Sequence, residues 1–394
     1  RNVSAGACPS VDRPDLEAFL QAPPVIFMLS AATHISLVRP DSVLLPLCAH
    51  LGDHGAVVAS EPAATVVTMG TARALLRAAD DVLDVTIEAK DLAGLQTMKL
   101  AIASHVVEFA LPGAIGSIVW TGDAADAALP PDFRVLTVVE TEALTPHMRR
   151  IRFRGADLAR FDTLEALHVR LFIPPAGLAE PVWPMIGADG LIHQPPADRR
   201  PAMRKYTIRE IDVAAGTLAI DFVVHDDAGP GSAFAARAQM GDHLGMAGPG
   251  GRGMREAERY IFLADETGLP ALSRMLEHLP SDATGLAMIE VVDARDELQL
   301  RAPSGIELRW LHRGHVAAGA SRQLPEAFAA LTWQPDDPRT YVWAALEHAA
   351  FKEIRSAARL CLRPDMDQHL IVSYWRSGLS EDQHALEKKA AMRA

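Results

Sequence analysis

The spacing of apolar residues changes along the chain, and this change constrains the fold more than any other feature of the sequence. From Phe133 to His225, apolar residues recur at every second position in short segments separated by Gly, Pro and Asp. From Tyr260 onward, strand-like apolar runs alternate with segments of helical periodicity. Many short strands with a period of two predict an antiparallel barrel. Strand–helix alternation predicts a parallel sheet covered on both faces.

The periodicity also predicts the bounds of the individual elements. The barrel strands are expected at Phe133–Glu142, Met148–Gly155, Ala166–Pro175, Arg204–Asp212 and Thr217–His225. The parallel strands are expected at Tyr260–Asp265, Ala287–Asp293, Glu307–His312, Thr340–Ala345 and His369–Trp375, with helices at Leu269–Leu279 and Phe351–Leu362. Ser380 and Gln383 have the spacing of a capping box, so a terminal helix is expected from Leu379.

A third region precedes the barrel. Helices are predicted at Val43–Leu51 and Leu92–Phe109, and strands at Thr65–Met69 and Asp84–Ala89. The stretch Thr121–Asp132 is rich in small and polar residues and is predicted to be a linker. With 394 residues, the chain is long enough for several domains. We predict a multidomain protein: a small N-terminal α/β accessory domain (1–122), an antiparallel β-barrel (132–253), a parallel α/β nucleotide-binding domain (256–378) and a C-terminal helix (379–394).

Composition excludes several classes of function. Lys and Arg total 38 against 50 Asp and Glu, so the net charge of −12 argues against a nucleic-acid partner. No uninterrupted run of 18 apolar residues is present, and the first twenty residues lack the apolar region of a signal peptide. The three cysteines lie far apart without a CxxC pair, which fits a reducing compartment. We therefore expect a cytoplasmic protein without stable membrane insertion, whose oligomeric state the sequence leaves open.

Three histidines of the N-terminal region are candidate metal ligands. His50 and His54 stand four residues apart, and His105 lies on the later predicted helix. Convergent imidazoles would suit zinc or haem. Gly52 and Gly55 interrupt the first helix, however, and no supporting acid is obvious. We favour structural histidines and predict no metal site.

Two segments of the predicted barrel have the chemistry of a flavin site. The strand Arg204–Arg209 offers an aromatic ring, hydroxyl groups and cations within six residues, although an ordinary solvated strand has the same pattern. Gly229–Ser232 follows a strand and precedes a short helix, where free backbone N–H groups favour a diphosphate. A simple Gly-Pro turn before a normally capped helix is the alternative.

Two further segments lie where the parallel sheet should bind ligands. Asp265–Ala271 joins a strand to a helix like a nucleotide loop, but it lacks GxGxxG. An acid that ends the next strand, Glu290 or Asp293, suits a ribose hydroxyl, whereas Arg295 suits a 2′-phosphate, so NADH and NADPH both stay open. Trp375 and Arg376 follow the last strand at the same edge, although a tryptophan is more often a core residue.

From Phe133 onward, the chain resembles the siderophore-interacting protein family of flavin-dependent ferric-siderophore reductases, relatives of ferredoxin–NADP reductase. The resemblance is carried by the order and spacing of several segments: PHMRRIRFRGADLARF, HVRLFIPP, RKYTIR, the loop from His225 to Ser232, DETGLPA, YVWAALEHAAFKEIR and YWRSG. It implies FAD bound non-covalently by the barrel, NADH or NADPH as reductant, and an anionic ferric siderophore as substrate. No side chain is expected to act as acid or base, because electrons pass through the flavin.

The resemblance also implies roles for individual residues. The positions matching the flavin, diphosphate and nicotinamide motifs are Arg204, Tyr206, Thr207, His225, Gly231, Ser232, Ala233, Asp265, Glu266 and Thr267. The candidate siderophore ligands are Arg170, Arg209, Trp375 and Arg376. Several positions depart from the family pattern: GPGSAF stands for GPASxW, DETGLPA for DETALPA, SYWR for GYWR and WAALEH for Trp-x-Ala-Gly-Glu. The glycine in DETGLPA is interpreted as a small-for-small change.

The resemblance therefore favours an iron-acquisition enzyme that passes electrons from NAD(P)H through FAD to Fe(III) and so releases Fe(II). A generic NAD(P)H:flavin or diaphorase-type reductase is the first alternative. A siderophore-binding protein with secondary reductase activity is the second. Residues up to about Ala110 resemble a small α/β domain of unestablished function that is sometimes fused ahead of these reductases, and this likeness implies no chemistry.

Overall fold

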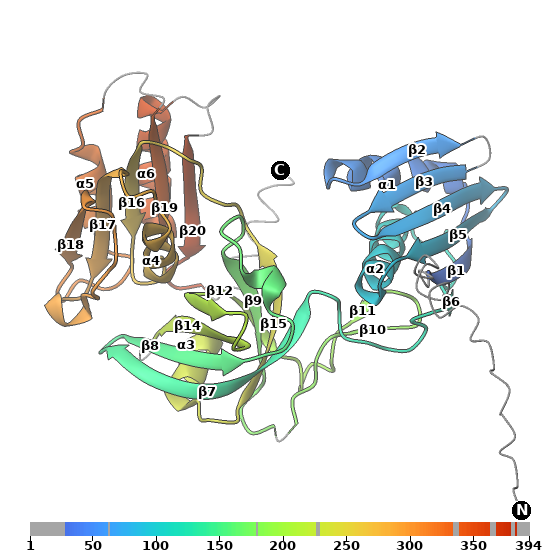
Figure 1. The fold of residues 1–394 in the computed structure, drawn as a ribbon, viewed down its shortest axis with the longest axis horizontal. Coiled ribbons are helices and arrows are strands. Elements are labelled where there is room, and N and C mark those ends of the chain that lie inside the picture. Colours follow the sequence, from blue (N-terminus) through green and yellow to red (C-terminus); the bar gives the residue numbers. More distant parts are fainter. Residues whose placement is uncertain are drawn as a thin grey trace, which may run out of the picture. The chain divides into compact units, whose positions relative to one another are not determined.

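The chain forms two compact units in the computed structural model, which describes residues 28–61, 64–178, 180–225, 229–333, 339–362, 368–379 and 383 (Figure 1). The first unit contains the described residues up to Pro131 together with Met185–His193. The second contains Asp132–Pro184 and the described residues from Gln194 onward. The terminal helix expected at 379–394 lies outside the described residues, except for Leu379 and Gln383.

The first unit is a six-stranded antiparallel sheet with two helices on its apolar side. Its strand order is β2-β3-β4-β5-β1-β6. The strands are β1 (Leu29–Ser36), β2 (Val57–Glu61), β3 (Ala64–Met69), β4 (Ala72–Ala79), β5 (Val82–Ala89) and β6 (Thr121–Gly122), and the helices are α1 (Pro40–Asp53) and α2 (Leu92–Phe109). Leu83, Val85 and Ile87 alternate along β5 and are at most 1% exposed, so they form the floor of this core.

Strand β4 shows where local sequence preference is misleading. Its sequence ARALLRAA is rich in alanine, the strongest helix former, and the sequence analysis assigns it no element. In the structure it pairs with β3 and β5 on its two sides, and Ala74 and Leu76 are fully buried. Tertiary pairing therefore overrides helix propensity here.

A hairpin from the middle of the chain belongs to this first unit. It consists of β10 (Met185–Ile186) and β11 (Ile192–His193). The indole of Trp120 donates to the carbonyl of Asp189 at 3.1 Å, and Ala128 N and Ile186 N each donate to the other residue's carbonyl. The predicted linker is therefore partly structured, since Thr121 and Gly122 pair with β1 and Ala128 pairs with the hairpin.

The second unit begins with the antiparallel barrel, whose strand order is β12-β9-β15-β7-β8-β14-β13. Its strands are β7 (Phe133–Thr145), β8 (Met148–Arg154), β9 (His168–Ile173), β12 (Ala202–Thr207), β13 (Glu210–Asp212), β14 (Thr217–Val223) and β15 (His243–Gly250); they are accompanied by η1 (Ala159–Phe161) and α3 (Pro230–Arg237). The antiparallel barrel is thus confirmed. The predicted strand Arg204–Asp212 is divided, because Ile208 and Arg209 separate β12 from β13.

The second unit ends with a five-stranded parallel sheet in the order β18-β17-β16-β19-β20, which confirms the predicted nucleotide-binding architecture (Figure 1). The strands are β16 (Arg259–Ala264), β17 (Thr284–Val291), β18 (Gly305–His312), β19 (Thr340–Glu347) and β20 (His369–Trp375). The helical elements are α4 (Leu269–Glu277), η2 (Ala294–Asp296), α5 (Gln323–Ala329) and α6 (His348–Cys361). Alternate residues of β16 enter two different cores: Tyr260 and Phe262 pack with α4, and Ile261 and Leu263 with α5 and α6.

None of the helices within the described residues is both long enough and apolar enough to span a membrane.

The start of β17 provides a test of the parallel sheet. A Cβ added to Gly285, whose φ is +146°, would lie 1.9 Å from the carbonyl oxygen of Tyr260. Gly285→Ala should therefore destabilise the protein by at least about 3 kcal/mol in chemical unfolding. Gly52→Ala is the matched control: it lies in α1 with nothing near the new Cβ and should stabilise by about 0.5–1 kcal/mol. Equal stability of the two variants would contradict this strand register.

Candidate functional site

Tyr206 and Thr207, at the end of β12, lie where the barrel turns toward the parallel sheet. The Tyr206 ring lies 4.5 Å from the ring of Phe222 in β14, measured between centroids, and Thr207 is 5% exposed. In Arg204, two residues earlier, the guanidinium donates to the Met203 carbonyl at 2.6 Å. The strand thus presents a supported, half-buried phenol ring.

The start of α3 approaches this ring closely. A Cβ on Gly231 would lie 2.0 Å from Tyr206 Oη, so only glycine allows this approach. The helix begins at Pro230 without a side-chain cap at Gly229. Ser232 Oγ accepts from His225 N at 3.0 Å and donates to the His225 carbonyl at 3.3 Å, which ties the preceding loop to the helix. An uncapped helix start beside an aromatic ring fits a flavin diphosphate.

On the parallel sheet, Asp265 follows β16 and is a buried acceptor for three chain segments. Its Oδ1 accepts from Thr267 N at 2.9 Å, Thr267 Oγ1 at 2.5 Å and Gly268 N at 3.3 Å. Its Oδ2 accepts from Glu347 N at 3.0 Å and Trp375 Nε1 at 2.8 Å. Burial raises the pKa of Asp265, whereas the donors from Thr267, Trp375 and Gly268 lower it. One carboxylate therefore fixes the ends of β16, β19 and β20 relative to each other.

Glu266 is buried beside this carboxylate and forms an ion pair with Arg313, whose side chain is also buried. Burial, together with the negative charge of Asp265, raises the pKa of Glu266 to about 7, although Arg313 opposes the shift. Glu290 at the end of β17 accepts from Ser321 Oγ at 2.6 Å, and burial raises its pKa too. Asp265, Glu266, Glu290 and Glu347 line one cleft, together with Ser321 and Trp375.

His168 and Tyr374 join the barrel to the sheet edge. His168 pairs with Thr207 in the β9–β12 register, and its Nε2 lies 3.0 Å from Tyr374 Oη. Tyr374 precedes Trp375, the donor to Asp265. Burial lowers the pKa of His168 to about 4, assisted by the positive charge of Lys205, and burial raises the pKa of Tyr374. The candidates on β12 are therefore connected to the Asp265 loop by two side chains to which the sequence analysis gives no role. Their presence in HVRLFIPP and YWRSG is the only sequence signal for them.

The candidate substrate arginines lie in different surroundings. Arg170 is exposed and donates to Asp132 at 2.8 Å, and Arg376 is half-buried after β20. The two terminal guanidinium nitrogens of Arg209 donate to Glu277 in α4, Nη2 at 2.6 Å and Nη1 at 3.0 Å, and the Arg209 side chain is 10% exposed. Arg209 is therefore less suited than Arg170 or Arg376 to bind a substrate, because this ion pair already occupies its guanidinium.

Arg295, the residue that suits a 2′-phosphate, is also engaged. Its guanidinium donates twice to Asp293, at 3.0 and 2.7 Å, and the pair holds the pKa of Asp293 well below its usual range.

The space around Gly268 in DETGLPA is tighter than we expect from the exchange of one small residue, alanine, for another. A Cβ there would lie 2.4 Å from the carbonyl oxygen of Ala345 in β19. The loop therefore lies directly against β19, and an alanine at this position requires a backbone shift.

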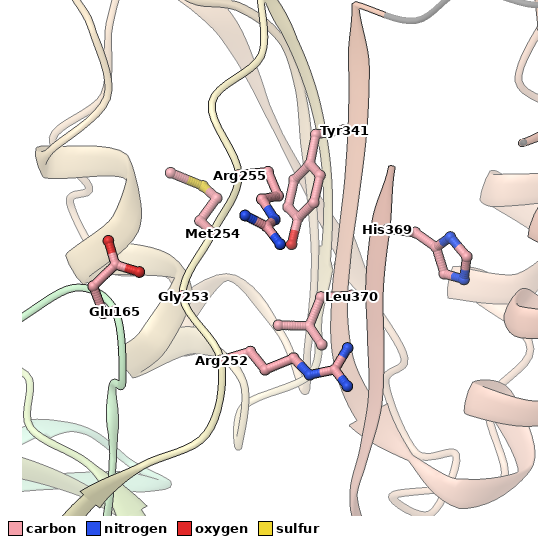
Figure 2. A pocket seen from close by; sticks show the side chains of 8 residues that line it. All are labelled: Glu165, Arg252, Gly253, Met254, Arg255, Tyr341, His369 and Leu370. Carbon is pink, nitrogen blue, oxygen red and sulfur yellow. The ribbon is translucent and has the colours of Figure 1, made fainter. Parts of the chain in front are cut away.

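A separate cavity of about 350 Å³ lies near the amino ends of β19 and β20, at the other edge of the parallel sheet. Figure 2 shows Arg252, Met254 and Arg255 of the segment before β16 on one side and Tyr341 and Leu370 of the strands on the other. The cavity contains none of the candidate residues.

The three histidines of the first unit form a row of rings. The His50 ring lies 4.6 Å from His54 and 4.6 Å from His105, and Nδ1 of His105 lies 2.6 Å from the Ala101 carbonyl. Among the residues described, no group of three His, Cys, Asp or Glu side chains is arranged to hold a metal ion.

Comparison with known proteins identifies the fold and its relatives. Residues 137–253 match the siderophore-interacting FAD-binding domain and residues 257–378 match the siderophore-interacting protein model. A siderophore utilization protein from T. fusca is 40% identical, with a TM-score of 0.56, over 63% of this chain and 94% of its own. The siderophore-interacting protein SipS from Aeromonas hydrophila is 32% identical, with a TM-score of 0.57, over 67% of this chain and 99% of its own.

The chain belongs to the siderophore-interacting protein family. The ferric vibriobactin reductase ViuB of Vibrio cholerae is a more distant relative, 29% identical over 66% of this chain and 95% of its own length. The N-terminal region is distinct from these reductases: residues 32–121 match an uncharacterized family conserved in bacteria, DUF2218. The resemblance drawn from the motifs is thus confirmed for both parts of the chain.

The contact between Gly231 and Tyr206 can be tested with the flavin. Gly231→Ala should displace the Tyr206 ring and weaken FAD binding by about tenfold or more, because overpacking costs about 1–3 kcal/mol. The dissociation constant is measured by titrating FAD-free protein and following flavin fluorescence. Gly250→Ala is the control, since a Cβ there meets nothing within 4 Å. Equal affinities in the two variants would remove Gly231 from the flavin site.

The raised pKa of Glu266 predicts a pH-dependent stability. The carboxyl holds its proton in the folded state up to about pH 7, but only to about 4.5 when unfolded. Glu266 therefore makes its full contribution to the free energy of unfolding below pH 4.5. About 3 kcal/mol of this contribution is lost as the pH rises from 4.5 through 7. Glu266→Gln lacks this titration, so its unfolding free energy relative to wild type should rise across that window. Urea unfolding of both proteins at a series of pH values checks this, and a constant difference would contradict it.

Proposed function

We propose that this protein reduces ferric siderophores with electrons taken from NADH or NADPH through a bound FAD. The observation that carries the proposal is the connection between two candidate sites within one compact unit. Tyr206 and the start of α3 form a cradle for a flavin, and the Asp265 loop lies at the ligand-binding edge of the parallel sheet. His168 and Tyr374 connect the two across the interface.

The residues fit FAD on structural grounds. Tyr206 supplies a ring for stacking, Gly231 leaves the space that a side chain would fill, and the N-terminus of α3 supplies backbone donors for the diphosphate. Arg204, His225, Ser232 and Ala233 are the further residues that we propose to hold it. When bound, FAD accepts a hydride from a nicotinamide and passes electrons one at a time to Fe(III).

The protein's own contribution is positioning and electrostatics. Asp265, Glu266 and Thr267 would orient the nicotinamide at the carboxyl edge of β16. Arg170 and Arg376, with Trp375, would hold the anionic ferric chelate, because a protein of net charge −12 needs local positive charge to bind an anion. The relatives named ferric reductases support the same substrate class. We place the reaction in the cytoplasm, where reduced nicotinamide nucleotides are available.

The deciding experiment is the visible spectrum of the purified protein followed by anaerobic addition of NADH or NADPH. A flavin spectrum that bleaches with either nucleotide, and returns when a ferric siderophore is added, supports the proposal. A protein that stays colourless after titration with FAD would refute it. Faster oxidation by free flavin or dyes than by ferric siderophores would instead identify a generic flavin reductase. Flavin that no nicotinamide reduces would favour a siderophore-binding protein.

Arg376→Ala should lower kcat/KM for an anionic ferric siderophore by about tenfold, the size of one charge-assisted contact, and leave FAD binding unchanged. Arg170→Ala should act in the same direction. Arg154→Ala, which removes an exposed arginine at the end of β8, is the control and should leave turnover unchanged. Steady-state kinetics checks all three. Wild-type turnover in both Arg376→Ala and Arg170→Ala would overturn the siderophore-site assignment.

A further inference from the structure

Helix α4 connects the two halves of the proposed electron path directly. It begins at Leu269, immediately after the Asp265–Gly268 loop, and Leu269 N donates to the Asp265 carbonyl at 3.0 Å. The helix is nine residues long, about 13 Å, and all but its last residue are buried. A displacement at its far end is therefore transmitted to the loop, because the loop and the first turn share backbone hydrogen bonds.

The far end of α4 is fixed to the strand that carries the flavin candidates. Arg274 is 4% exposed, and its Nη1 donates to the Ile208 carbonyl at 2.9 Å. Glu277, the last residue of the helix, accepts the two hydrogen bonds from Arg209. Ile208 and Arg209 directly follow Thr207, at the point where β12 ends. The helix thus extends from the Asp265–Gly268 loop, here called the nicotinamide loop, to β12, here called the flavin strand.

Two positive and two negative side chains meet at this contact. Arg274 lies near Arg209, and burial, assisted by that like charge, lowers the pKa of Arg274. Asp162, whose carboxylate lies 3.7 Å from Arg274, and Glu277 supply the two opposing charges. A bidentate arginine–carboxylate pair fixes direction as well as distance, which a hydrophobic contact does not.

Cohesion between the barrel and the sheet has other sources. Met148 and Leu167 of the barrel are buried in the same core as Tyr260, Phe262 and α4. His147 Nδ1 also lies 2.9 Å from Asp296 Oδ2. The Arg209–Glu277 pair is therefore one of several contacts between the two parts, and its bidentate geometry also fixes their relative orientation.

We propose that Arg209, Glu277 and Arg274 are positioning residues that set the distance between the flavin strand and the nicotinamide loop. Hydride transfer needs reacting atoms about 3–3.5 Å apart, and a misplacement of about 1 Å lowers the rate by about a hundredfold. Transfer of electrons from the flavin to a ferric chelate needs no such alignment of a nicotinamide, so it should depend much less on α4, although Trp375 is hydrogen-bonded to Asp265. The inference rests on the proposed function, and it assigns these residues to only one of the two half-reactions.

The test separates the half-reactions in Glu277→Gln, which keeps the shape of the side chain and removes its charge. Anaerobic stopped-flow reduction of the bound flavin by NADH or NADPH should slow by about tenfold or more. Reoxidation of dithionite-reduced protein by a ferric siderophore should stay within about twofold of wild type, and the FAD dissociation constant should not change. The long-wavelength charge-transfer absorbance of reduced protein with the oxidised nucleotide should weaken, because it reports ring overlap rather than turnover.

The double variant Arg209→Glu with Glu277→Arg restores the pair with reversed charges and should recover part of the reduction rate. Glu307→Gln is the matched control, because Glu307 pairs with Arg309 at 2.8 Å on the exposed side of β18. Equal slowing of both half-reactions in Glu277→Gln would identify a merely structural contact, and no slowing would remove its role; either result overturns the inference. Failure of the wild-type flavin to be reduced by any nicotinamide would instead refute the proposed function and the inference with it.

Discussion

A single buried carboxylate, that of Asp265, holds the carboxyl edge of the parallel sheet together. Asp265 accepts hydrogen bonds from its own loop, from the end of β19 and from the indole that follows Tyr374. A carboxylate with 5% exposure is tolerated because five donors replace its water. The position of Trp375, and hence of Arg376 next to it, depends on this acceptor. Glu347 extends the arrangement, since its own carboxylate accepts from Ser377 N at 3.1 Å.

At His168 and Tyr374, the barrel and the edge of the sheet meet through two uncharged groups. Burial keeps His168 neutral at physiological pH, and Tyr374 keeps its proton. A neutral imidazole beside a phenol can share a hydrogen bond without bringing a net charge into the interface. The cleft next to them has the opposite character, with four carboxylates along its lining.

The architecture of this protein follows from periodicity, whereas the geometry of its site does not. The alternation in Thr217–His225 and the strand–helix pattern after Tyr260 reflect burial, which depends on residue type and spacing alone. The clearance at Gly231, the pairing of Arg209 with Glu277 and the fit of Gly268 against Ala345 are distances between segments remote in sequence. RKYTIR identifies Arg209 as a nearby cation but does not reveal that α4 supplies its counter-ion. The alanine-rich β4 is not predictable for the same reason, because pairing with β3 and β5, and not its own residues, makes it a strand.

The hairpin Met185–His193 has a consequence for how this chain can be divided. Its strands lie in sequence between β9 and β12 of the barrel, yet Ile186 is 4% exposed and Leu191 packs against the core of the first unit. The chain therefore crosses between the units three times, before Asp132, before Met185 and after His193. Expression of the reductase portion from Asp132 onward would leave an apolar hairpin without its partner surface, and the N-terminal unit alone would lack the segment that covers Trp120. The boundary between the two units is therefore discontinuous in sequence.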